Sequence, residues 1–268
     1  MQTLLTQHDA SHFVATDPFP FPLIWVSWLK LMMKHLLVLL VTGACLAEGA
    51  WARSSCSSDG QLAPITLVER FISADCEACW SAPQATHPKG RAITIDWIVP
   101  SGQGDDASLS AAATRDAQMR LEALARTAPG TLMLVTTKVQ RHRDSHLRVA
   151  HGVPIGDYIG AIIEWRTNTI AKPREPLSAW LLLVETIAAG AEGTPVERNL
   201  VRNVLVLTWD KPDKRSDTGQ YLFQELRPLN IEQGAKAQHL RVLGWVQNAQ
   251  GQLLTAAQSV CETAIQKR

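Results

Sequence analysis

Two cysteines separated by two residues are the most chemically specific feature of the chain. Cys76 and Cys79 come directly after an apolar, β-branched run at residues 65–72, so the pair lies where an expected strand ends. This arrangement is typical of a redox dithiol, and the same spacing also occurs in zinc sites and structural disulfides. The motif therefore leaves three interpretations open: an exchanging dithiol, a structural disulfide and a metal site.

The residues next to the cysteines bear on which interpretation holds. A redox pair needs its first sulfur as a thiolate, which makes Cys76 the expected nucleophile and Cys79 the resolving thiol. Asp75 and Glu77 flank Cys76 with two carboxylates, which oppose ionisation of its thiol. The acidic flank favours a stable disulfide, whereas the cysteine spacing favours exchange.

The segments around the dithiol predict an α/β unit. Pro83, Pro88 and Gly90 leave room for one or two helical turns after the cysteines. A longer helix is expected at 108–126, with Asp106 or Ser108 as its N-cap. The expected strands of this unit are residues 65–72, 92–99 and 132–135.

Beyond residue 140 the pattern changes to short apolar runs separated by turn signals, which predicts an antiparallel, β-rich region. These runs are residues 147–150, 158–165, 180–185, 200–209, 221–226, 240–247 and 253–257. The predicted fold class is α/β, with domains at 53–140 and 141–268 and an upstream segment at 1–52.

The upstream segment predicts export. From Met33 the sequence has a charged start, an apolar run and Ala50-Trp51-Ala52, the pattern of a cleaved signal peptide. Lipid attachment at Cys45 and an uncleaved membrane anchor are the two alternatives. A periplasmic or secreted location follows, with membrane contact only through this segment.

Export places the remaining cysteines in an oxidising compartment. Cys56, Cys76, Cys79 and Cys261 form an even set, and proximity favours Cys76 with Cys79. Cys56 and Cys261 then remain as a pair that would close almost the whole mature chain.

Other partners and cofactors find little support. Lys and Arg number 26 against 25 Asp and Glu, so no basic surplus indicates nucleic acid. No phosphate-binding loop is present, and no cofactor is expected. The histidines at 142, 146 and 151 lie in a polar segment that favours a solvated connector over a metal site.

The strand and dithiol resemble a family of secreted thioredoxin-like proteins of Gram-negative bacteria, domain-of-unknown-function family 1223. Val68–Ser73 is similar to the family's V-x-L-F-T-S strand before C-x-x-C, and Ile95-Asp96-Trp97 resembles its V-D-Y-W segment. Further likeness lies at 108–110, 128–130, 203–206 and 242–257, so that it spans about residues 65–257. Trp80 departs from the family, which has two prolines after the second cysteine.

The resemblance implies a thioredoxin-like domain followed by a β-rich region. It also implies that Pro129 is a loop proline beside the dithiol, although a simple helix terminator is the alternative. Asp96 and Trp97 either line the same surface or are a strand-end polar group beside a core aromatic. Two functions follow: disulfide exchange with a protein partner, or a non-enzymatic envelope binding or scaffold protein with a structural Cys76–Cys79 disulfide.

Overall fold

The computed structural model describes residues 56–83, 90–140, 144–168, 175–216 and 219–261. The chain divides into two compact units, Met1–Ala52 and Arg53–Arg268, and every described residue belongs to the second. The predicted signal peptide, with its start at Met33, therefore lies outside the described residues. Within the described part, no helix combines the length and apolar character needed to cross a membrane.

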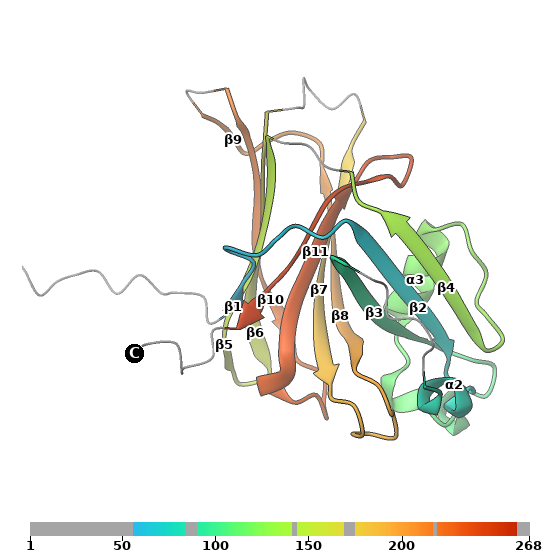
Figure 1. Cartoon of the computed structure of the whole chain (residues 1–268). Coiled ribbons are helices and arrows are strands. Elements are labelled where there is room, and N and C mark those ends of the chain that lie inside the picture. Colours follow the sequence, from blue (N-terminus) through green and yellow to red (C-terminus); the bar gives the residue numbers. More distant parts are fainter. Residues whose placement is uncertain (1–55, 84–89, 141–143, 169–174, 217–218, 262–268) are drawn as a thin grey trace, which may run out of the picture. The chain divides into compact units, whose positions relative to one another are not determined.

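Two β-sheets form the described part of the chain (Figure 1). The seven-stranded sheet has the order β12 (Leu253–Gln258), β11 (Leu240–Gln247), β7 (Leu177–Ile187), β8 (Arg198–Trp209), β3 (Ala92–Val99), β2 (Thr66–Ser73) and β4 (Leu132–Lys138). The six-stranded sheet has the order β13 (Val260–Cys261), β1 (Cys56–Ser57), β5 (Ser145–Ile155), β6 (Tyr158–Thr167), β10 (Tyr221–Asn230) and β9 (Lys214–Arg215).

Strand β7 of the seven-stranded sheet is buried on both faces, which explains why its sequence is almost continuously apolar. Leu181 and Leu183 pack with side chains of the six-stranded sheet, including Val149 and Ile163. The alternate residues of β7, such as Leu182, face the other core. Because side chains alternate along a strand, a strand covered on both faces needs apolar residues at every position.

The two sheets approach closely at Gly244 of β11. A Cβ atom built at this glycine would lie 2.9 Å from Val149 Cγ1 and 3.0 Å from both Ile163 Cδ1 and the Trp180 carbonyl oxygen. The glycine is therefore required by the packing of the sheets.

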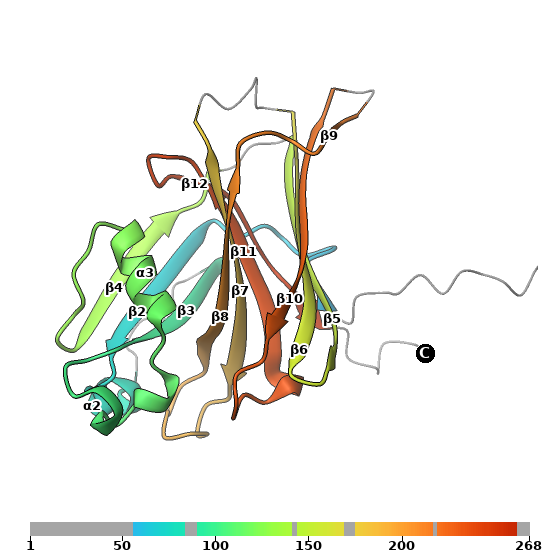
Figure 2. The ribbon, with the colours of Figure 1, turned by 180° about the vertical axis from the view of Figure 1, so that it is seen from behind.

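Two α-helices occur in the described residues, α2 (Glu77–Ser81) and α3 (Arg115–Ala123). Figure 2 shows α3 lying over the seven-stranded sheet near β2 and β3, where Ala117 and Leu121 join the core. Single 3-10 turns add η1 (Gly104–Asp106), η2 (Ser110–Ala112) and η3 (Ala237–His239).

The predicted fold class, α/β with a thioredoxin-like domain followed by a β-rich region, is wrong. Helix is limited in the described residues to two α-helices of five and nine residues, whereas the two sheets contain thirteen strands. The parallel pair β2 and β3 is not a separate α/β layer, because Asp96 of β3 pairs with Leu200 of β8. One sheet thus takes strands from both sides of residue 140.

The helix expected at 108–126 is shorter in the structure, where it spans Arg115–Ala123, because the residues before it form other hydrogen bonds. Ser108 Oγ and the Leu109 amide both donate to the Ala74 carbonyl, at 3.3 and 3.0 Å, and tie this segment to the end of β2. The helix begins only at Arg115, where the Thr114 hydroxyl accepts from the Ala117 amide at 3.3 Å. Thr114 is therefore the N-cap, and the expected caps Asp106 and Ser108 are wrong.

Candidate functional site

The C-x-x-C cysteines lie at the turn from β2 into α2. Cys76 is the N-cap residue of this short helix, and its carbonyl accepts from the Cys79 amide at 3.0 Å and the Trp80 amide at 3.3 Å. The two cysteines are joined as a disulfide, with their Cα atoms 5.2 Å apart. Both are partly exposed, whereas Ala74 before them and Trp80 after them are buried. The disulfide therefore lies at the boundary between core and solvent.

A small apolar cluster supports the disulfide from below. Its buried members come from β2, α2, β3, β7 and β8 and from the residues that directly follow β2 and η1, and both cysteines pack against it. These members are Ile72, Ala74, Trp80, Ile98, Ala107, Ile187 and Leu200. The cluster covers one side of the disulfide, and the partial exposure of both cysteines leaves the other side open to solvent.

The two carboxylates expected to flank Cys76 do so in the structure. Asp75 and Glu77 are both exposed, and Asp75 Oδ1 accepts from Ser101 Oγ at 2.6 Å. A thiolate formed at Cys76 would therefore lie beside negative charge, although solvent weakens that interaction at exposed positions.

Arg198 anchors the helix that carries the disulfide. Its Nη2 donates to the carbonyls of Trp80 at 2.6 Å, Cys79 at 3.2 Å and Ala82 at 3.5 Å. Its guanidinium also lies 5.1 Å from the centre of the Trp80 ring. A buried cation at the last carbonyls of a helix satisfies acceptors that have no partner within the helix.

The charge of Arg198 is balanced by Asp96, which is fully buried. Arg198 Nη1 lies 3.3 Å from Asp96 Oδ1, while Arg70 Nη2 and the Asn199 amide donate to Oδ2 at 2.6 and 3.0 Å. Burial lowers the pKa of Arg198, and Asp96 opposes that shift. This network connects the helix to the centre of the seven-stranded sheet.

Asp96 and Trp97 thus lie in the interior and not on the surface beside the dithiol. Trp97 is fully buried and stacks on Phe71 with ring centres 5.9 Å apart. All six tryptophans among the described residues are buried, in agreement with a packing role for this residue type.

A second buried ion pair holds α3 on the same sheet. Arg120 donates to both carboxylate oxygens of Glu69 at 2.8 Å and to Gln247 Oε1 at 3.2 Å. Its guanidinium lies 4.8 Å from the ring centres of Trp180 and of Trp245. Neither Arg120 nor Arg198 was predicted from the sequence, in which the one local signal is Glu69 with Arg70 inside an apolar strand.

Pro129 lies at the same end of β2 as the dithiol. Leu132, the first residue of β4, pairs with Ile72, and the Thr131 carbonyl accepts from the Ser73 amide at 2.7 Å. Pro129 is partly buried three residues before that strand. The register therefore brings the proline toward the cysteine turn, and its predicted role in exchange remains a prediction.

A cavity of about 280 Å³ borders the apolar cluster that supports the disulfide. Trp80, Leu109 and Ala112 belong both to its wall and to the cluster packed on the cysteines. Glu192 and Arg202 add charged groups to the lining. The cavity beside the site is therefore lined by both apolar and charged side chains.

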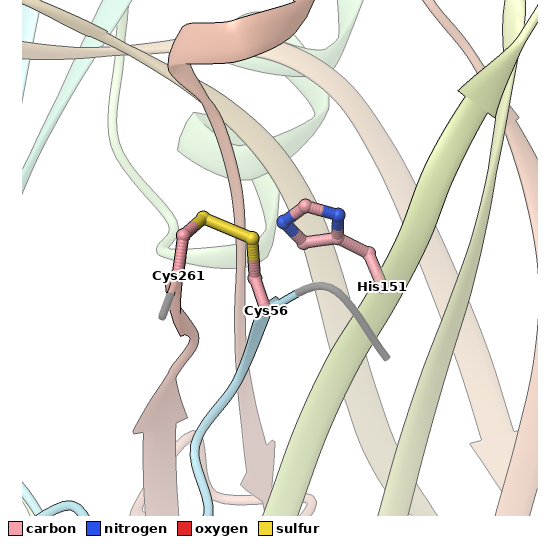
Figure 3. Close-up of side chains that lie close together, drawn as sticks. All are labelled: Cys56, His151 and Cys261. Atoms are coloured by element: carbon pink, nitrogen blue, oxygen red, sulfur yellow. A yellow bond between two sulfur atoms is a disulfide. The ribbon is translucent and has the colours of Figure 1, made fainter. Parts of the chain in front are cut away.

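A second disulfide joins Cys56 and Cys261, 205 residues apart, as predicted. Figure 3 shows the His151 ring directed toward it. Burial lowers the pKa of His151, and hydrogen bonds to the backbone of Gly152 and Leu240 oppose that shift. His151 is 4% exposed and lies in β5, so the expected solvated connector is wrong at this residue; His142 lies outside the described residues.

Comparison with known proteins gives a distant structural similarity. No family model matches the chain, and no curated protein matches it. Among solved structures, HBP35 of Porphyromonas gingivalis aligns with a TM-score of 0.45 and 13% identity, over 78% of this chain and 80% of that one. A similarity at this level supports no conclusion about fold or function.

Proposed function

We propose that this chain exchanges disulfides with another protein through Cys76 and Cys79. The observation that carries the proposal is the position of the Cys76–Cys79 disulfide, which is partly exposed between β2 and α2 beside a hollow. Accessible disulfides are the ones that a partner thiolate can attack.

The exchange proceeds by two substitutions at sulfur. A thiolate of the partner attacks Cys76 Sγ, a mixed disulfide forms, and Cys79 leaves as the thiolate. A second thiolate of the partner then attacks the partner's own sulfur and releases Cys76. The partner is oxidised to a disulfide while the dithiol is reduced by two electrons, and the reverse steps reduce a partner.

The contacts of Arg198 support this role by holding α2 in place. Three of its carbonyl contacts are to residues 79, 80 and 82, so the helix stays anchored when the bond between the sulfurs opens. A fixed helix keeps Cys79 close enough to Cys76 to close the disulfide again.

The second candidate is an envelope binding or scaffold protein in which Cys76–Cys79 is a structural disulfide. The observation that favours it is the exposed pair Asp75 and Glu77, because their negative charge disfavours a thiolate at Cys76. Both disulfides fit the proposed periplasmic or secreted location, since such bonds persist in oxidising compartments.

Trapping of the mixed disulfide separates the two candidates. The full-length Cys45→Ser/Cys79→Ser chain, treated with a disulfide-containing peptide, should accumulate one adduct at Cys76, because no other free thiol remains to resolve it. The Cys45→Ser/Cys76→Ser chain is the matched control and should form its adduct more slowly. Equal adduct rates in the two variants, or a wild-type chain that speeds dithiol oxidation no more than the Cys76→Ser/Cys79→Ser chain, would refute exchange.

A further inference from the structure

Three side chains with metal-binding atoms meet on one face of the six-stranded sheet. Cys56 of β1 pairs directly with Cys261 of β13 on one side and with His151 of β5 on the other. Residues directly opposite in antiparallel strands project their side chains to the same face. The two cysteine sulfurs and one ring nitrogen of His151 accordingly lie within 4.8 Å of one another.

The orientation of His151 is that of a metal ligand. Its Nδ1 lies 2.9 Å from the Gly152 carbonyl oxygen, a contact that holds the ring in one orientation. Figure 3 shows the other ring nitrogen, Nε2, facing the disulfide. A backbone carbonyl on the other ring nitrogen is the usual support for a histidine that binds zinc.

The distances suit a tetrahedral ion once the sulfurs are separate. Zinc binds sulfur at about 2.3 Å and nitrogen at about 2.0 Å, which places ligand atoms roughly 3.5–4 Å apart. Cys56 and His151 are buried, at 5% and 4% exposure, and Cys261 is the least buried of the three. An ion held here would reach solvent on the Cys261 side, where a water could be its fourth ligand.

We propose that reduction of the Cys56–Cys261 disulfide converts this cluster into a zinc-binding site made of two thiolates and His151. A dithiol reductant transfers two electrons and two protons to the disulfide, forms its own disulfide, and leaves two thiols. Zinc then binds both sulfurs and releases two protons. The ion takes the place of the covalent link, so β13, β1 and β5 stay joined in either redox state.

Cobalt is the probe for this site, because thiolate-bound Co²⁺ has an intense charge-transfer absorption. The experiment uses the full-length Cys45→Ser/Cys76→Ser/Cys79→Ser chain, in which Cys56 and Cys261 are the only cysteines left. After reduction with a phosphine, we expect one equivalent of Co²⁺ to bind with this absorption and to be displaced by Zn²⁺. Before reduction we expect no such absorption.

The role of the histidine is tested in the same background. His151→Asn should weaken Co²⁺ binding at least about tenfold, whereas His146→Asn, an exposed histidine of the same strand, should leave it unchanged. No thiolate absorption after reduction, or equal affinities of the His151→Asn and parent chains, would overturn the proposal. If His151→Asn does not fold, X-ray absorption spectroscopy of the zinc-loaded parent chain identifies the atoms bound to the zinc and so tests the site. Two sulfur and two nitrogen or oxygen neighbours support the site, and any shell without two sulfurs and a histidine contradicts it.

Discussion

The two disulfides should differ several-fold in how much they stabilise the fold. The Cys56–Cys261 bond spans 205 residues, and the Cys76–Cys79 bond spans three. In the chain-entropy model, closing a loop lowers the entropy of the unfolded chain, and this loss increases with the logarithm of the loop length. At about 298 K the model gives roughly 5 kcal/mol for the long loop and roughly 1.6 kcal/mol for the short one.

Urea unfolding of three full-length chains measures these values. Relative to wild type, Cys56→Ala/Cys261→Ala should lose about 5 kcal/mol of unfolding free energy and Cys76→Ala/Cys79→Ala about 1.6 kcal/mol. The first variant should also show a larger m-value, because its unfolded chain is more expanded. Equal losses, or a greater loss in the second variant, would show that unfolded-state entropy does not govern these bonds.

Three further predictions concern the described core. Arg198→Met should lower the unfolding free energy by about 3 kcal/mol, because it leaves the α2 carbonyls and part of Asp96 unpaired in the interior; a loss below about 1 kcal/mol in urea unfolding would contradict the network. Gly244→Ala should cost about 1–3 kcal/mol, since its methyl group would overlap Val149 and Ile163, and an unchanged melting temperature would be the adverse result. Burial raises the pKa of Glu232 from its ordinary value of 4.5, so the stability this group contributes is complete below about pH 4.5 and decreases as the pH rises through the folded pKa. Glu232→Gln should therefore match wild type near pH 4 and be more stable than wild type near pH 7, and the same difference at both values would exclude this cause.

Local sequence patterns were sufficient for individual strands and for the cysteine pairing. The run expected as a strand at 65–72 is β2, and the residues expected at 92–99 are β3. Both predicted disulfides are confirmed, because proximity and parity restrict how four cysteines can pair. Such features depend on neighbouring residues or on simple counting.

Features that depend on distant partners could not be predicted. Arg120 meets Glu69 and Gln247 across 51 and 127 residues, and Arg198 meets Asp96 across 102. Nothing in the sequence near Arg198 indicates that it is buried. The polar sequence around His151 likewise did not indicate that this residue lies in a strand and that its ring is buried.

The fold class was wrong because a sheet is defined by pairing and not by local periodicity. Strand, helix and strand at the start of the chain are compatible with a separate α/β domain. The contact of Asp96 with Leu200 instead joins β3 to β8, and only the tertiary structure contains that information.

The order in which the two disulfides open tests the proposed exchange most directly. The full-length chain is equilibrated in dithiol buffers of graded potential, quenched with acid, alkylated, and analysed by peptide mass spectrometry. We expect labelling of Cys76 and Cys79 while Cys56 and Cys261 remain joined, because both cysteines of the first bond are partly exposed, whereas Cys56 of the second bond is buried between its partner strands β13 and β5. Opening of Cys56–Cys261 first, or opening of Cys76–Cys79 only when the chain unfolds, would contradict a role in exchange.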